Sequence, residues 1–420
     1  MQIQHRNSFF KYRTNQHLAQ YRKFRNIVTL IKRVEIKQYF KEKCKGSTKN
    51  KDFWKAVKPI FSKTKTKQDS IPLRENGKIV TDNNEICNIF NNFFREIGSD
   101  IGKKEDLSKS INELVDDYEE HQSITNISTA INNMHRNFDF EEVSEQEIIK
   151  IMKNLSTKKA SGYDEIPIKF IKKASRQLSK PITMIVNQCL LQNIFPDNMK
   201  KANITPLYKK KDKLNKDNYR SVNLLIALSK IIEKVISYQI YEFIKPLLHT
   251  YLSGFRKGYG CQDILIRMTE DWRKALDNGK IIGTIAIDLS KAFDCMPHGL
   301  LIAKLKAYGF TENACKLLKS YLVNRKQRVK IGNNFSEWVS NIKGVPQGSI
   351  LGPLLFNIFI NDFLFLKLNA KTYNYADDNT LSYAGSCIND IKAKLEEDCL
   401  KSMEWFKDNN MKANADKFKL

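Results

Sequence analysis

The sequence contains no C-x-x-C pair, although it has eight cysteines scattered along its length. This spacing argues against a zinc site and a disulfide framework, and it favours reduced thiols in the cytosol or nucleus. The first thirteen residues are charged and lack an apolar core, so they predict no secretory signal. Asn357, Asn361 and Asp362 interrupt the apolar stretch at 350–366, for which we predict a buried helix rather than a membrane span.

Acidic residues are scarce relative to basic ones, with Asp+Glu 46 against Lys+Arg 71 and a net charge of +25. A chain this basic most often binds a polyanion, usually nucleic acid; the alternative is a merely solvated basic surface. The 420 residues, of which 41% are hydrophobic, are enough for a large globular core. Strands interleaved with helices predict an α+β architecture.

Several local patterns predict individual elements. Residues 1 to about 70 are strongly basic and mostly helix-forming, and 79–102 predict a further helix with one apolar face. Ser144 and Glu147 have the spacing of a capping box at a helix start. The other elements that we predict are helices at 181–192 and 227–243, a hairpin at 332–334, and an edge strand at 204–207 because Pro206 cannot donate to a ladder.

Three aspartates stand out. The strand predicted at 281–289 is apolar on both faces and carries Asp288 near its end. Tyr375-Ala376-Asp377-Asp378 has β-branched and aromatic flanks, which predict a β-hairpin with two carboxylates at its tip, although aspartates are common in turns for structural reasons alone. If the strands pair, three carboxylates converge. Two Mg²⁺ ions about 3.5–4 Å apart would then bridge them, one activating a 3′-hydroxyl and one holding a triphosphate.

Transfer of a phosphoryl group also requires cations that meet the phosphates. Lys209 and Arg220 are candidates, because a lysine supplies a point charge and an arginine a bidentate fork. For each residue alone, the alternative is a solvated surface cation.

Six stretches carry a family resemblance through their order and spacing. They are KKASGYDEIP, ITPLYKKKDKLNKDNYRSVNLL, GFRKG, AIDLSKAFDCMPHGLLIAKL at 286–305, GVPQGSILGPLLFNIFIND at 344–362 and YADD at 375–378. Together they resemble the polymerase blocks of reverse transcriptases, specifically those of non-LTR retrotransposons of the jockey-like group. The resemblance covers about residues 138–420, and looser similarity extends to the start of the chain.

The resemblance implies a role for each matching residue. Asp288 matches the first metal-binding aspartate, and Asp377 and Asp378 match the carboxylate pair. Phe293 matches the aromatic residue that blocks the nucleotide 2′-hydroxyl, while Asp294 in the same block is interpreted as structural. The remaining matches are Gln347 and Gly348 in the loop against the incoming nucleotide and template, Lys209 and Arg220 as fingers residues on the triphosphate, and Lys417 as the lysine that protonates pyrophosphate.

The resemblance also implies a domain organisation. Residues 1–137 are expected to form the basic, mostly helical segment that precedes the polymerase, and 138–420 the reverse transcriptase domain. Within a right-hand polymerase fold, fingers are expected at about 138–280 and an antiparallel palm sheet with helices at about 281–420. No thumb would follow Leu420, so the chain is expected to be a fragment of a longer polyprotein.

The sequence departs from the family pattern at Ser221, Asn223 and Leu252-Ser253, where proline, serine and glutamine are usual, and these departures raise the prospect of impaired activity. We predict an intracellular RNA-directed DNA polymerase that uses two Mg²⁺ ions, with Mn²⁺ as the alternative, an RNA template with a DNA primer, and dNTPs, without a membrane. One alternative is a catalytically incomplete nucleic-acid-binding remnant. The other is an RNA-dependent RNA polymerase, against which Phe293 argues.

Overall fold

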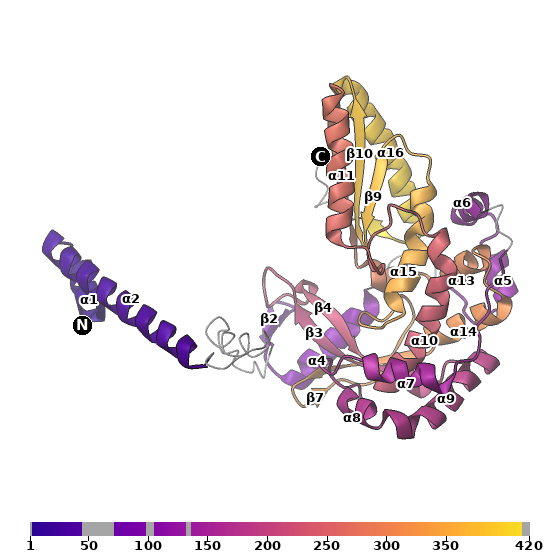
Figure 1. Cartoon of the computed structure of the whole chain (residues 1–420), viewed down its shortest axis with the longest axis horizontal. Coiled ribbons are helices and arrows are strands. Elements are labelled where there is room, and N and C mark those ends of the chain that lie inside the picture. The colour runs from indigo at the N-terminus through magenta and orange to yellow at the C-terminus, as the bar shows by residue number, and fades with distance from the viewer. Residues whose placement is uncertain (1, 44–70, 98–104, 132–135, 414–420) are drawn as a thin grey trace. The chain divides into compact units, whose positions relative to one another are not determined.

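The computed structural model describes residues 2–43, 71–97, 105–131 and 136–413, and the chain divides into two units between Asp69 and Ser70. The first unit contains helices α1 (Gln2–Tyr12) and α2 (Asn15–Lys43), which pack against each other (Figure 1). The predicted helical character of the basic N-terminal region is therefore confirmed for 2–43, whereas 44–70 lie outside the described residues. The second unit runs from Ser70 to Leu420. Residues 71–131, which belong to the predicted N-terminal segment 1–137, therefore lie in the same unit as the predicted polymerase region.

The second unit mixes helices and sheets, which fits the predicted α+β class. Its α-helices are α4 (Asn83–Glu96), α5 (Ile111–Asp116), α6 (Gln122–Ile131), α7 (Glu145–Asn154), α8 (Ile168–Lys173), α9 (Ser175–Gln192), α10 (Ala227–Ile244), α11 (Cys261–Asp277), α12 (Ala292–Cys295), α13 (His298–Ala307), α14 (Glu312–Leu322), α15 (Gly352–Ile360) and α16 (Ile388–Asp408). Its 3₁₀ helices are η1 (Asp197–Met199), η2 (Lys216–Asn218), η3 (Lys245–Leu247) and η4 (Asn361–Phe365). Its strands are β1 (Leu73–Glu75), β2 (Lys78–Val80), β3 (Lys201–Tyr208), β4 (Tyr219–Leu224), β5 (Ile281–Ser290), β6 (Arg325–Ile331), β7 (Asn334–Phe335), β8 (Val339–Asn341), β9 (Lys371–Tyr375), β10 (Asp378–Gly385) and β11 (Lys412–Ala413).

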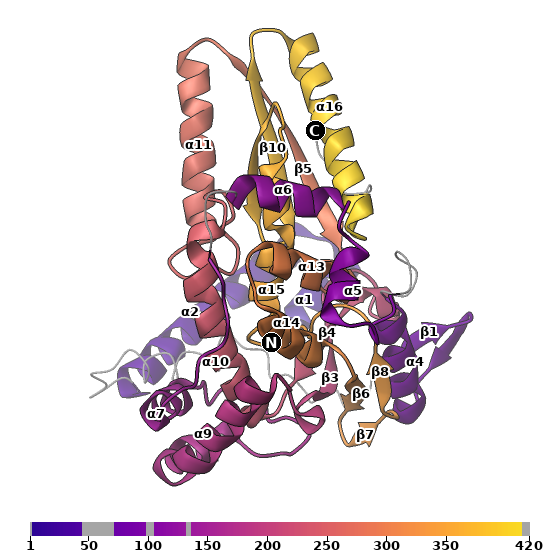
Figure 2. The same ribbon diagram turned by 90° about the vertical axis from the view of Figure 1, so that its right-hand side faces the viewer.

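An antiparallel four-stranded sheet has the order β11-β5-β10-β9 and lies between α11 and α16 (Figure 2). Ile391 and Leu395 of α16 belong to the same buried cluster as Ile285 and Ile287 of β5. On the other face, Trp272 Nε1 of α11 donates a hydrogen bond to a β10 serine, Ser382 Oγ, at 2.8 Å.

The prediction that the strand at 281–289 is buried on both faces is wrong. Ile285, Ile287 and Leu289 are buried, whereas Ala286 between them is exposed and Ile281 is 44% exposed. The physical reason is that α16 packs apolar side chains onto one face of this antiparallel sheet, whereas α11 covers the other face incompletely and leaves Ala286 exposed, so that only alternate residues enter the core.

The second sheet has the order β4-β3-β6-β7, and β8 also pairs with β6. Strand β3 is therefore internal at Lys201–Ile204, whereas 205–208 pair with β4 alone, so the predicted edge position of Pro206 is confirmed locally. Pro206 lies opposite Ser221 in the antiparallel pair with β4, whereas the parallel pairing of β3 with β6 ends at Ile204. The proline is accommodated because that parallel ladder stops two residues before it.

Other local predictions are confirmed. Ser144 and Glu147 form a capping box at the start of α7, and α10 spans the predicted helix. Ile331 pairs with Asn334 around the predicted hairpin turn. The apolar stretch at 350–366 is a buried helix, α15, continued by η4. Within the described ranges, no helix is both long and apolar enough to cross a membrane.

A buried ion pair anchors η4 to the core. Lys304 Nζ lies 2.6 Å from Asp362 Oδ1, and both side chains are fully buried. Lys304 also donates to the Phe359 carbonyl at 2.8 Å, and Trp405 Nε1 donates to Asp362 Oδ2 at 2.8 Å. Burial lowers the pKa of Lys304 to about 8, although Asp362 opposes this change.

Removing one partner of this pair is expected to destabilise the fold. Lys304→Met would leave the Asp362 carboxylate buried without its cation, which costs about 3–5 kcal/mol in the free energy of unfolding. The double variant Lys304→Met/Asp362→Leu is expected to recover most of that loss because no buried charge remains. Urea denaturation of the three proteins measures both effects, and equal stability of the single and double variants would contradict the account.

Candidate active site

The pairing of β5 with β10 places two of the predicted metal ligands directly opposite each other. Asp378 is the register partner of Asp288. Opposed residues of an antiparallel pair have Cα atoms about 4.5–5.5 Å apart and side chains on the same face. The two carboxylates therefore share one face of the four-stranded sheet.

The third predicted ligand lies in the turn between β9 and β10. Tyr375 pairs with Asp378, so Ala376 and Asp377 form a two-residue loop. This confirms the prediction of a hairpin with the two aspartates at its tip. Ala376 has a φ of 58°, a left-handed conformation that few residues other than glycine adopt. The structure thus brings Asp288 and the Asp377-Asp378 pair to one end of the sheet.

Two buried asparagines hold this turn from within. Asn374 Nδ2 donates to the Ala376 carbonyl at 2.9 Å and to Asn379 Oδ1 at 2.8 Å. Both asparagines are almost completely buried. Hydrogen bonds in the protein interior are electrostatically stronger than in water. Neither residue is among the predicted site residues, although asparagines are unusual within strands and this is a signal that could have indicated them.

The segment before α11 supports the turn from the other side. Ser253 N donates to the Asn374 carbonyl at 3.1 Å. Asn357 Nδ2 of α15 donates to the Gly254 carbonyl at 2.7 Å. A Cβ atom on Gly254 would collide with the backbone nitrogen of Ala376, so a glycine is required for this close approach. The GFRKG block therefore has a packing role that its sequence alone did not reveal.

Phe293 lies immediately after β5, in α12. The chain turns there because Lys291 is in the left-handed conformation, with a φ of 52°. The ring of Phe293 is half-buried: it stacks on Phe356 with centroids 4.4 Å apart, and it meets the ring of Phe255 edge-on at 5.7 Å. One side of Phe293 is thus backed by the core, and Phe255 beside it is 53% exposed.

The loop before α15 contacts both α12 and β4. Gln347 Nε2 donates to Asp294 Oδ2 at 2.6 Å, and the Gln347 carbonyl accepts from Asn223 N at 2.8 Å. Gly348 has a φ of +109°, and a Cβ atom there would lie 2.9 Å from the Asn223 carbonyl oxygen. Burial raises the pKa of Asp294 to about 7, although the hydrogen bond from Gln347 and the charge of Lys291 oppose this change. Asp294 therefore fixes the position of the Gln347 amide.

A buried carboxylate on α10 holds the other end of this loop. Glu233 Oε2 accepts hydrogen bonds from the backbone nitrogens of Ile350, at 2.6 Å, and Leu351, at 3.3 Å. These amides precede α15, where the helix dipole also favours a negative charge. Burial raises the pKa of Glu233, whereas Arg325 and the two amides oppose this change.

Lys209 and Arg220 lie on the β3–β4 hairpin, in a different sheet from the carboxylates. Arg220 pairs with Leu207, and Lys209 N donates to the Asn218 carbonyl at 2.8 Å just beyond the strand. Both cationic side chains are exposed. An ion pair at 4.0 Å between Asp217 of this hairpin and Lys291 connects it to the end of β5.

The carboxylates suit a hard divalent cation. Carboxylate oxygens are the ligands that Mg²⁺ prefers, and like charges placed side by side favour a cation between them. In the part of the chain that the structure describes, no three acidic, histidine or cysteine side chains are close enough to hold an ion by themselves. Catalytic Mg²⁺ is usually held by one or two carboxylates together with substrate phosphates and water, so the donor set fits such an ion.

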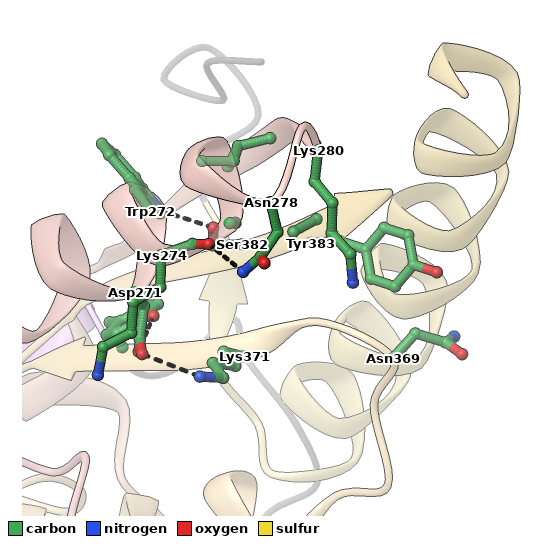
Figure 3. Close-up of a pocket in the computed structure, with 13 residues that line it drawn as sticks. Asp271, Trp272, Lys274, Asn278, Lys280, Asn369, Lys371, Ser382 and Tyr383 are labelled. Carbon is green, nitrogen blue, oxygen red and sulfur yellow. Dashed lines mark hydrogen bonds and ion pairs between the residues drawn. The ribbon is translucent and has the colours of Figure 1, made fainter. Parts of the chain in front are cut away.

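A pocket of about 300 Å³ lies farther along the same sheet, between α11 and strands β9 and β10 (Figure 3). At its wall Lys371 Nζ lies 3.0 Å from Asp271 Oδ1, and Tyr373 donates to the other carboxylate oxygen at 2.7 Å. The three predicted metal ligands are not among its lining residues. Lys417, the last predicted site residue, lies outside the described residues.

Curated proteins similar to this chain are named as RNA-directed DNA polymerases of mobile elements. The transposon BS protein of Drosophila melanogaster, named a probable RNA-directed DNA polymerase, is 30% identical over 282 residues, which cover 65% of this chain and 31% of that protein. The RNA-directed DNA polymerase from mobile element jockey of Drosophila funebris is 30% identical over 287 residues, which cover 66% of this chain and 31% of that protein. The matched part of the chain thus spans about a third of the length of these curated relatives.

A second comparison concerns families. Residues 208–420 match the family described as "Reverse transcriptase (RNA-dependent DNA polymerase)". This range is half of the 420-residue chain and contains the paired carboxylates, their turn and the loop before α15. The resemblance to jockey-like reverse transcriptases that the sequence motifs indicated is confirmed, and the chain belongs to the reverse transcriptase family.

Proposed function

We propose that this chain is the RNA-directed DNA polymerase part of a non-LTR retrotransposon protein, and that it joins dNTPs to a primer 3′-hydroxyl on an RNA template. The observation that carries the proposal is the register of β5 and β10, which sets Asp288 opposite Asp378 beside the turn containing Asp377. In this proposal the four-stranded sheet is the palm and the β3–β4 hairpin belongs to the fingers.

The three carboxylates would hold the divalent ions, with Mg²⁺ as the first choice and Mn²⁺ as the alternative. Such ions lower the pKa of a bound hydroxyl and neutralise charge on the phosphates. Lys209 and Arg220 would bind the triphosphate, because both are exposed cations on one hairpin. Transfer of a nucleotidyl group depends mainly on such positioning and charge stabilisation.

Phe293 and Gln347 would position the sugar and base of the incoming nucleotide. Phe356 backs the Phe293 ring, so the ring cannot retreat from an added 2′-oxygen without disturbing the core. Asp294 keeps the Gln347 amide in place, and the Asn223 contact fixes the loop backbone. A steric clash between the Phe293 ring and the 2′-hydroxyl of a ribonucleotide favours a DNA polymerase over an RNA polymerase.

The first prediction concerns the carboxylates. Asp377→Asn is expected to lower primer extension by several orders of magnitude, since an anionic ligand is lost, while binding of the primer–template is retained. Asp277→Asn, an exposed aspartate at the end of α11, serves as the matched control and should retain wild-type extension. Extension and binding are measured on the same preparations; near-normal extension by Asp377→Asn would refute the assignment. If the wild-type protein itself binds the primer–template but does not extend the primer, the chain is instead a catalytically incomplete remnant.

The second prediction concerns sugar selection. Phe293→Val is expected to raise incorporation of ribonucleotides relative to deoxynucleotides by about tenfold or more. The reason is that the smaller side chain relieves the steric clash with the 2′-oxygen, and each step of about 1.4 kcal/mol changes selectivity tenfold. Phe310→Leu, a change in the buried Phe138–Phe243–Phe310 cluster, should lower stability without altering that ratio. Kinetics with both nucleotide types give the ratio. An unchanged ratio and a lower melting temperature for Phe293→Val would remove Phe293 from the site.

The third prediction concerns Asp294. Its pKa is raised to about 7 in the folded chain, compared with about 3.9 for an ordinary aspartate, so folding favours the protonated form. The contribution of this group to stability is therefore lost as the pH rises from about 4 to about 7. Asp294→Asn should remove that dependence. The free energy of unfolding of the variant minus that of wild type should therefore be more positive at pH 8 than at pH 5. Urea denaturation of both proteins at the two pH values tests this. If the stability difference between Asp294→Asn and wild type is the same at both pH values, Asp294 does not titrate in this way.

A further inference from the structure

A second hydrophobic core joins the segment at 71–97 to the β3–β4 hairpin. Phe90 of α4 is buried in one cluster with Ile204 of β3 and Tyr219 of β4, and this cluster is separate from the larger core that contains β5. The ring of Phe90 meets the Tyr219 ring edge-on, with centroids 4.9 Å apart. The segment precedes 208–420, the range that matches the reverse transcriptase family. It nevertheless packs against the hairpin that carries the two proposed triphosphate-binding cations.

Strand β1 holds the loop of this hairpin, which we define as residues 209–218. Arg74 N donates a hydrogen bond to the Leu214 carbonyl at 2.7 Å. Lys216 Nζ lies 2.7 and 2.9 Å from the two carboxylate oxygens of Glu75, and both side chains are half-buried. An ion pair with such geometry and partial burial is better defined than an exposed pair. The hairpin loop is therefore fixed to β1 at two points.

Phe93 of α4 lies between the hairpin loop and the end of β5. Lys291 Nζ lies 4.6 Å from the centroid of its ring, and Lys216 Nζ lies 5.9 Å from that centroid. Both distances are within the range of a cation–π interaction. Lys291 is the left-handed residue between Asp288 and Phe293, whereas Lys216 belongs to the hairpin loop. The half-buried ring of Phe93 therefore contacts one cation from each of the two parts of the proposed site.

The charges around this ring allow the two lysines to share it. Two ammonium groups repel each other, but the negative face of an aromatic ring attracts both. Each lysine also has a carboxylate partner, which is Glu75 for Lys216 and Asp217, at 4.0 Å, for Lys291. Asp217 follows Lys216 directly in the hairpin loop. The cluster thus connects β1, α4, the hairpin loop and the end of β5.

We propose that Phe93 is a positioning residue that fixes the distance between the β3–β4 hairpin and the paired carboxylates, and that it thereby sets the affinity for the incoming dNTP. This proposal rests on the proposed polymerase function. The two hairpin cations can bind the triphosphate only while they stay within reach of the ions at the carboxylates. A misplacement of about 1 Å is enough to weaken such an arrangement strongly. Phe93 acts through Lys216 and Lys291, so it needs no contact with the nucleotide.

The test measures dNTP affinity without chemistry. The protein is bound with Mg²⁺ to an RNA template and a dideoxy-terminated DNA primer, and the complementary dNTP is titrated while retention of the complex against heparin is followed. Phe93→Leu is expected to weaken dNTP binding about threefold to tenfold, because leucine is apolar but has no aromatic face for the two cations. Binding of the primer–template without dNTP should be unchanged. Phe93→Tyr, which keeps the ring, should bind dNTP as wild type does.

Two further variants separate a positioning role from a merely structural one. Ile86→Val, at a fully buried position of the same helix, is the matched control: it should lower the melting temperature and leave dNTP affinity unchanged. In a Lys291→Met background, Phe93→Leu should have a smaller effect on dNTP affinity, since the nearer of the two cations is already missing. Thermal unfolding and dNTP titration are carried out on the same preparations.

Three outcomes would overturn the proposal. They are unchanged dNTP affinity in Phe93→Leu, an equal loss of affinity in Phe93→Tyr, and an equal loss of affinity in Ile86→Val. Extension of an ordinary primer by the wild-type protein is measured in parallel. A dNTP affinity that depends on Phe93 without any extension would support the positioning role while refuting the polymerase function. Extension by wild type with a dNTP affinity that is independent of Phe93 would refute the positioning role alone.

Discussion

The antiparallel pairing of β5 with β10 is the constraint on which the site depends. Side chains alternate between the two faces of a strand, so a slip of one residue would turn Asp378 away from Asp288. The register is fixed because Ile285 and Ile287 on one face of β5 must meet the core beneath α16. Hydrophobic burial on one face thus determines the position of the carboxylates on the other.

Buried polar groups then place the turn and the loops around these strands. Asn374 and Asn379 donate to the backbone of the hairpin turn, and Asn357 of α15 donates to the Gly254 carbonyl, in the segment packed against that turn. Glu233 and Asp294 hold the two parts of the loop before α15. Each of these groups would be costly to bury without a partner, and together they specify a single arrangement of the loops.

The positive charge of the chain is used in different ways at different positions. Lys304 and Lys200 are buried, and each is neutralised by an aspartate. Lys209 and Arg220 are exposed on a hairpin, where solvent screens their charge.

The sequence by itself determined the family, the α+β class and the hairpin of the YADD motif, because these depend on local patterns and on the order of short motifs. It also indicated that the stretch at 350–366 is buried, but it did not show why Asn357, Asn361 and Asp362 are tolerated there. Only the tertiary structure supplied their partners: the Gly254 carbonyl, the backbone around Leu247 and His249, and the Lys304 ammonium group.

The pairing of the first half of β3 with β6 and the one-sided burial of β5 were likewise decided by tertiary structure. A proline and an apolar run have the same local preferences whichever strands and helices pack beside them. The roles of Asn374 and Gly254 also depend on segments that are distant in the sequence. Contacts of this kind depend on which elements meet in space, and the local sequence does not contain that information.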